Sequence, residues 1–164
     1  MAIEHAILTW IHLLAAAIWV GGSIFIGIVF SPILKSISTS VEDRIQIMIK
    51  VGKRFNKVAV PSLIILMVTG LYNSHILLSK PDLLMATSYG TFLIIKIILV
   101  IALIITYAVH VRVIRKDVED EIMSKQMSLQ QIQKLRKKII ILGEITVVLS
   151  VAILFFAALL DAGV

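Results

Sequence analysis

The segment from Gly90 to Val111 reads GTFLIIKIILVIALIITYAVHV, and it decides the fold. Its only ionisable side chains are those of Lys96, Tyr107 and His110. A run of about 20 apolar residues is what a helix needs to cross roughly 30 Å of hydrocarbon. In lipid a single segment satisfies its backbone hydrogen bonds as a helix, and this one lacks the period-two alternation of a barrel strand. We therefore predict a transmembrane helix here.

Three further segments have the same character, at about 7–30, 58–78 and 139–160. The composition agrees, since 59% of the 164 residues are hydrophobic and 16% are charged. Soluble domains have roughly 45–50% apolar and about 25% charged residues. The sequence predicts an all-α fold, a four-transmembrane-helix bundle that forms one integral membrane domain over residues 1–164. Because Met1 to Ile7 contains no Lys or Arg, we expect the first helix to be retained rather than cleaved as a signal.

The basic residues are unevenly distributed along the chain, whose net charge is +6. The second connection has only Lys80, whereas the first and third are strongly basic. By the positive-inside rule, we expect both termini on the outer side of the cell membrane and the two long connections on its cytoplasmic side. Basic residues on the cytoplasmic side of a membrane indicate contact with anionic lipid headgroups, so we expect no nucleic acid partner. The basic residues of the long connections are Lys35, Arg44, Lys50, Lys53, Arg54, Lys57, then Arg112, Arg115, Lys116, Lys125, Lys134, Arg136, Lys137 and Lys138.

Both long connections carry helix signals. Between Val41 and Phe55, apolar residues recur at helical spacing with charges between them, so we expect an amphipathic helix lying on the membrane surface. Ser128 is a helix N-cap candidate, and the helix it begins is predicted to run into the fourth span. A helix of that length extends about 50 Å, well beyond the bilayer.

Ionisable residues within membrane spans are functional hypotheses by default, because each costs free energy unless it is paired, ligated or hydrated. His12, His75 and Lys96 are predicted to lie at a similar level of the outer leaflet on three different helices. A pair of imidazoles in a helical bundle holds a haem iron or a bare transition metal such as copper. The structural alternatives are a plain interhelical hydrogen bond for His12, hydration of His75, and a Lys96 side chain that extends to the interface.

Helical spacing gives these residues neighbours. On the first helix, Trp19 shares the stripe of His12 together with small residues, so we include it among the candidate cofactor-binding residues. On the third helix, Tyr107 and His110 share the stripe of Lys96, which we expect to face the interior. They form a possible inner polar cluster with Glu144, in which a hydrogen bond from Tyr107 or His110 neutralises the carboxylate. The functional alternative for this cluster is a proton relay or contact with a quinone headgroup.

Several motifs resemble known families. The runs WIHLLAAAIWVGG at 10–22, RFNKVAV at 54–60, TGL at 69–71 and YGTFLIIK at 89–96 look like the CopD-type copper-resistance membrane domain. They are also similar to HemJ-type protoporphyrinogen oxidases, four-helix proteins with a signature His on the first helix and Lys on the third. The resemblance implies copper passage in the first case and haem b with redox chemistry in the second. His12 and Lys96 match the signature positions, and His75 belongs to neither pattern.

The chain has no cysteine, and few methionines fall in the outer half, so a copper path would rest on histidines. We therefore predict a membrane haem b protein with His12 as axial ligand and His75 or Lys96 as the second. Its function would be electron transfer, or oxidation of a quinone or porphyrin as a membrane oxidoreductase. The alternatives are a CopD-like copper transport or tolerance protein that uses His12 and His75, and a structural membrane subunit. A homo-oligomer is compatible with each.

Overall fold

The computed structural model describes residues 2–38, 40–114, 121–122, 124 and 127–163, and the described part consists of helices and short connections with no strand. The first helical rod consists of α1 (Ala2–Ala16), the π-helical turn η1 (Ala17–Gly21), α2 (Gly22–Ile24), a second π-helical turn η2 (Phe25–Phe30) and α3 (Ser31–Ile37). It is followed by α4 (Val41–Leu78), the short α5 (Pro81–Ala86), α6 (Ser88–Val113) and α8 (Leu129–Asp161).

Four of these helical segments are long and apolar enough to span a membrane, as the sequence predicts. Their outward faces carry large apolar side chains. On α6, for example, Ile98, Ile101 and Ile105 are each more than half exposed and recur at helical spacing. A soluble protein does not expose such a stripe, and a membrane protein turns it toward lipid. The all-α, four-helix membrane fold is confirmed.

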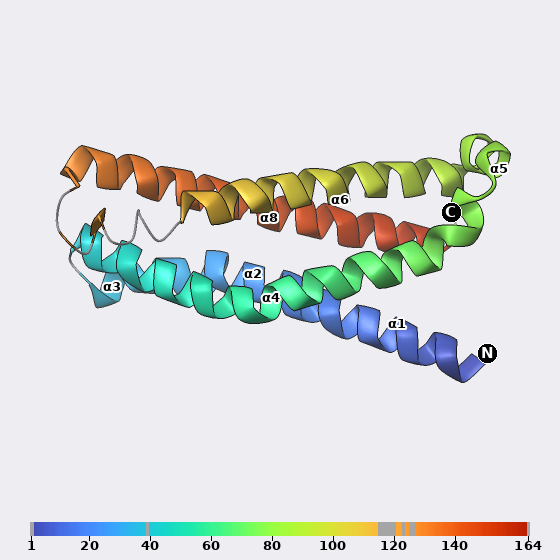
Figure 1. Ribbon diagram of the computed structural model, residues 1–164, viewed down its shortest axis with the longest axis horizontal. Helices are drawn as coiled ribbons and strands as arrows, with labels where there is room; N and C mark the ends of the chain where they lie inside the picture. Colours follow the sequence, from blue (N-terminus) through green and yellow to red (C-terminus); the bar gives the residue numbers. More distant parts are fainter. Residues whose placement is uncertain (1, 39, 115–120, 123, 125–126, 164) are drawn as a thin grey trace.

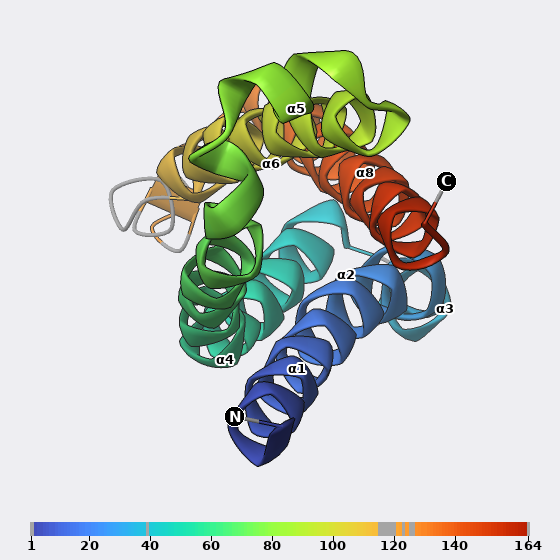
Figure 2. The same cartoon turned by 90° about the vertical axis from the view of Figure 1, so that its right-hand side faces the viewer.

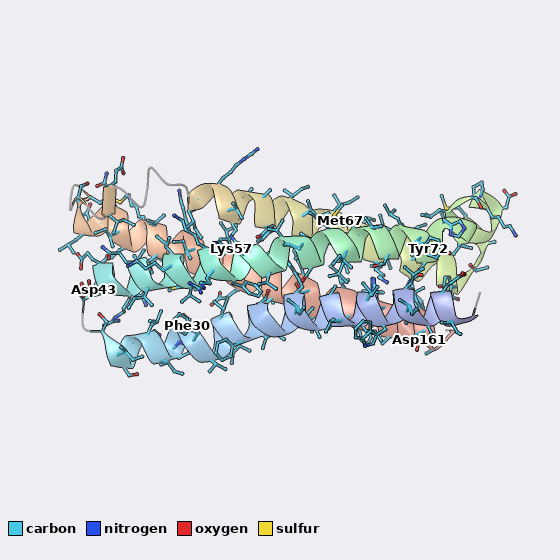
Figure 3. The ribbon with its side chains drawn as sticks, turned by 60° about the horizontal axis from the view of Figure 1, so that its bottom comes forward. Phe30, Asp43, Lys57, Met67, Tyr72 and Asp161 are labelled. Carbon is cyan, nitrogen blue, oxygen red and sulfur yellow. The ribbon has the colours of Figure 1, made fainter. Side chains whose placement is uncertain are left out.

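The four long helices pack as two pairs, α1 against α4 and α6 against α8 (Figures 1 and 2). Both chain termini and α5 lie at one end of the molecule, which we call the terminal end (Figure 1). The last residues of α3 and α6 and the first residues of α4 and α8 lie toward the opposite end, which we call the loop end (Figure 1). Figure 3 shows Tyr72 and Asp161 near the terminal end and Asp43 at the loop end.

A helix forms at Val41–Phe55 as predicted, but the expectation that it lies on the membrane surface is wrong. This segment is the first part of α4, which continues through Pro61 to Leu78 as one helix. Its apolar side chains Ile45 and Ile49 are buried in a cluster with residues of α8, so they pack against protein instead of lipid. The helix therefore projects along its own axis beyond the apolar span. The buried cluster at the loop end comprises Ile45, Ile49, Ile122, Ile132, Leu135 and Ile139.

The helix predicted from Ser128 into the fourth span is confirmed. The Ser128 hydroxyl accepts the Gln131 backbone N–H at 3.3 Å, and the Gln131 side chain accepts the Ser128 backbone N–H at 2.8 Å. This reciprocal capping box satisfies two N–H groups that a helix start leaves without partners. From there α8 runs unbroken to Asp161. Of the basic residues in this connection, Arg115, Lys116 and Lys125 lie outside the described residues.

A second buried cluster joins the two helix pairs near the middle of the molecule. It contains Trp19 and Val20 from the first rod, Ala59 and Leu63 from α4, and Leu103 from α6. Ala59 is fully buried, which allows the first rod and α6 to approach α4 closely. We call this cluster the waist, because a cavity lies on each side of it.

Candidate functional site

The cavity on the terminal side of the waist has a volume of about 370 Å³ and lies between the two helix pairs. We call it the terminal cavity. Most of its wall is apolar, with contributions from the first rod, α4, α6 and α8. Its polar lining residues are His12, Trp19, Ser74, Lys96 and Ser150. Among the described residues, no Asp or Glu lines this cavity.

His12 is held in the terminal cavity by Thr69 of α4. Its Nδ1 lies 2.6 Å from the Thr69 hydroxyl oxygen. That hydroxyl donates its own hydrogen to the backbone carbonyl of Ile65 at 2.6 Å, so it accepts from His12. The ring hydrogen is therefore assigned to Nδ1, which leaves the Nε2 lone pair available. Metal-binding histidines characteristically have their second nitrogen fixed by such a partner.

Gly70 of α4 lies next to this ring. A Cβ built on Gly70 would lie 3.9 Å from Cε1 of His12, which is ordinary van der Waals contact, so the site has space for an alanine here. Of this adjacent pair, Thr69 is therefore the residue that fixes the imidazole.

Lys96 lines the same cavity from α6 and is partly buried there. The structure thus brings together His12 and Lys96, which lie 84 positions apart in the sequence.

His75 is not part of this site. Its ring is exposed, contacts the Tyr72 ring at a centroid distance of 5.5 Å, and bonds through Nδ1 to the Tyr72 backbone carbonyl. The predicted pairing of His12 with His75 is therefore not formed. The reason is helical phase, because one residue advances the direction by about 100°. Ser74 faces the terminal cavity, and the next residue points away from it.

The cavity on the loop side of the waist is larger, about 660 Å³, and more polar. We call it the loop cavity. Tyr107, His110 and Glu144 all line it, so the structure brings the predicted inner polar cluster together. Lys53 and Asn56 of α4 line it as well.

The hydrogen bonds within the loop cavity differ from those predicted. The Tyr107 hydroxyl donates to Oδ1 of Asn56 at 2.9 Å, not to Glu144. His110 lies against α8, with its Cε1 3.7 Å from the position of a Cβ on Gly143. The Glu144 side chain is exposed, so water can solvate its carboxylate and no tyrosine or histidine partner is required.

Trp19 forms part of the wall of both cavities. It is 2% exposed, and its indole N–H donates to the Ser150 hydroxyl at 3.0 Å. Its ring meets that of Tyr107 edge-on, with centroids 5.0 Å apart. Trp19 was expected among cofactor-binding residues, and the structure places it at the boundary of the terminal cavity.

Three polar residues of this interior were not predicted from the sequence as site residues: Asn56, Thr69 and Ser150. Each is a partner of a residue that was singled out, namely Tyr107, His12 and Trp19. A single neutral polar residue in an apolar helix gives little signal by itself. The runs RFNKVAV and TGL contain Asn56 and Thr69, and those motifs were the available clue.

Soft and borderline metal ligands occur on both sides of the waist. Met67 lines the terminal cavity with His12, and Met48 lines the loop cavity with His110. Thioether and imidazole groups both suit copper. Within the described part of the chain, no group of three or more His, Cys, Asp and Glu side chains is placed to hold a metal ion.

Comparison with known proteins gives one match. The sequence profile of the family described as Copper resistance protein D matches residues 49–160, more than half of the chain. The matched region contains most of α4 and all of α5 and α6, and it extends along α8; the rod that carries His12 and Trp19 precedes it. No curated protein and no solved structure gives a significant match. With its four apolar helices, this chain is an integral membrane protein that belongs to the copper resistance protein D (CopD) family.

Proposed function

We propose that this protein passes copper ions across the membrane through the interior of its helix bundle. The observation that carries the proposal is the pair of cavities on opposite sides of the waist, each lined by one imidazole and one thioether. Membership of the copper resistance protein D family supports copper as the ion. Together, the two cavities make up most of the proposed copper route along the bundle.

In the terminal cavity, Nε2 of His12 is the proposed first ligand for copper. Its lone pair is available because Nδ1 is committed to Thr69. Met67 lines the same cavity and offers a thioether, the ligand type that favours Cu(I). Because most of the wall is apolar, these two groups supply most of the compensation for the water that the ion loses.

In the loop cavity, His110 and Met48 offer the same two ligand types. Glu144 adds a carboxylate, which attracts a cation to this side of the waist. We propose that the loop cavity opens to the cytoplasm and the terminal cavity to the outside, as the distribution of Lys and Arg predicts. The whole chain acts in this proposal as one membrane domain, with the basic loop end against anionic headgroups.

Copper binding by the purified protein tests the first step. Equilibrium dialysis with Cu(I) under a reducing, oxygen-free atmosphere gives the stoichiometry and affinity, and copper X-ray absorption gives the ligand types. We expect copper with nitrogen and sulfur scattering at two sites, one in each cavity, and at least a tenfold loss of affinity at one of them in His12→Ala. The matched control is His75→Ala, which removes an exposed imidazole and leaves binding unchanged. Equal affinity in His12→Ala and the wild type would refute the assignment.

Haem b in the terminal cavity is a second candidate, favoured by one observation. His12 and Lys96 line a cavity whose wall is mostly apolar and has no carboxylate among the described residues. These residues fit a haem held by His12 Nε2, with Lys96 as a second nitrogen ligand or as the partner of a propionate. They do not fit a His12 and His75 pair, because His75 lies outside the cavity. Bound haem would supply one-electron chemistry toward a quinone or porphyrin.

An absorption spectrum separates the two candidates. Haem gives a Soret band and split visible bands on reduction, and both His12→Ala and Lys96→Gln would then lose the pigment. Under the copper proposal, the purified protein is colourless in this range and Lys96→Gln still binds copper through His12. A preparation with neither pigment nor copper binding would favour a structural membrane subunit instead.

A further inference from the structure

The structure leaves one question about the proposed route, namely what separates the two cavities. Trp19 is the residue that both cavities share and that also belongs to the buried waist. We infer that the Trp19 indole is the barrier between two half-channels and that its displacement opens the route. The inference deepens the proposed copper passage and rests on it.

The indole is fastened on two sides. Its N–H donates to Ser150, whose own hydroxyl hydrogen is committed to the Thr146 carbonyl at 2.7 Å. The Ser150 oxygen therefore acts only as an acceptor toward the Trp19 indole N–H. On its other side, the indole meets the Tyr107 ring edge-on at 5.0 Å. Both contacts join the first rod to the α6 and α8 pair across the middle of the molecule.

Tyr107 connects this barrier to the loop cavity. Its hydroxyl donates to Asn56, which lines that cavity, while its ring holds the indole. On the terminal side, Ser150 lines the other cavity, while its hydroxyl holds the indole N–H. Each cavity therefore contains a group that holds Trp19 in place. We infer that an ion bound in either cavity can affect the position of the indole through that group.

The backbone at Trp19 departs from regular α-helix. Trp19 lies in the π-helical turn η1 (Ala17–Gly21), a local widening of the helix that is often found at functional sites. The Ser23 hydroxyl donates to the Trp19 carbonyl at 2.7 Å, which gives that carbonyl a side-chain partner. Gly21 ends the turn and has no atom within 4 Å of its Cβ position, whereas the Phe55 ring of α4 is packed against Gly22, the next residue.

Trp19 differs in its burial from a tryptophan that faces lipid. The chain has one other tryptophan, Trp10, on the same rod. Trp10 is 63% exposed, whereas Trp19 is 2% exposed. Trp10 therefore provides a matched control, since its removal deletes the same side chain from the same rod without touching the waist.

The absence of native cysteine allows a direct test that needs no copper. Single cysteines are introduced by Ser74→Cys in the terminal cavity and Ser31→Cys in the loop cavity. A small, cationic, membrane-impermeant methanethiosulfonate is then added to one side of oriented vesicles. With Trp19 present, each cysteine should react from one side only, and the two from opposite sides. In a Trp19→Ala background, each should react from both sides, with at least a tenfold higher rate from the formerly closed side.

Trp10→Ala should leave the one-sided pattern unchanged. Because Trp19→Ala empties a buried position, Ser150→Ala is the gentler variant, which removes the hydrogen bond and keeps the indole. It should raise labelling from the closed side by several-fold without loss of the folded protein. Two-sided labelling with Trp19 intact, or one-sided labelling in both Trp19→Ala and Ser150→Ala, would overturn the inference. Copper binding at His12 is measured separately, so a failed barrier and a failed copper function give different results.

Discussion

His12 and Thr69 form a directed hydrogen bond between the first rod and α4, with 2.6 Å between Nδ1 and the hydroxyl oxygen. Since the Thr69 hydrogen goes to Ile65, the bond fixes which imidazole nitrogen is free. It also aligns α1 with α4 at the level of the terminal cavity. One neutral residue of α4 thus sets the chemistry of a histidine 57 positions away in the chain.

Thr69→Val tests this relationship. Valine keeps the shape of the side chain and removes the acceptor, so His12 loses its fixed tautomer and orientation. We expect copper affinity to fall about 10- to 100-fold, the typical effect of losing such a partner. Thr69→Ser keeps the hydroxyl and should stay within a few-fold of the wild type in the same dialysis measurement. Wild-type affinity in Thr69→Val would show that the bond does not prepare the ligand.

The bond between Tyr107 and Asn56 contributes to the packing of α6 against α4. We expect Tyr107→Phe and Asn56→Ala each to lower the free energy of unfolding in detergent. A double-mutant cycle should give a coupling of about 1 kcal/mol, the usual net value of such a hydrogen bond. Strictly additive effects would mean that the two side chains do not interact in the folded protein.

Two glycines should respond in opposite ways to alanine. A Cβ on Gly90 would lie 2.1 Å from the Leu84 carbonyl oxygen, so the backbone between α5 and α6 would have to move. Gly90→Ala should cost about 1–3 kcal/mol, as overpacking does. Gly52, inside α4, has no atom within 4 Å of its Cβ position, and Gly52→Ala should stabilise by about 0.5–1 kcal/mol. Thermal melts that rank the two variants in the reverse order would contradict the structure.

Much of the fold follows from composition and spacing alone. The span from Gly90 to Val111 lies within α6, because a long apolar run in lipid has one backbone solution. The start of α8 at Leu129 follows from the Ser128 capping box. The segment Val41–Phe55 was misplaced because amphipathic periodicity does not tell whether an apolar face meets lipid or protein. Its partner, the start of α8, is distant in sequence, and only the folded structure supplies the buried contact.

The site was predicted in part. His12 and Lys96 do share a cavity, since ionisable residues at similar depth in adjacent helices tend to face the interior. His75 was assigned from depth alone, and depth does not fix the direction of a side chain around its helix. Trp19 was placed on the correct face by its spacing from His12, but its partner Ser150 is 131 positions away. Polar partners such as Ser150 and Asn56 become visible only when the helices are packed.

Copper flux into sealed proteoliposomes tests the central proposal most directly. Vesicles loaded with a copper-sensitive indicator and containing the wild type or His75→Ala should fill with copper when Cu(I) is added outside. Vesicles with His12→Ala should fill at least tenfold more slowly, at a rate close to that of protein-free vesicles. Equal flux through His12→Ala and the wild type, or wild-type flux no faster than that of empty vesicles, would contradict copper passage through the bundle.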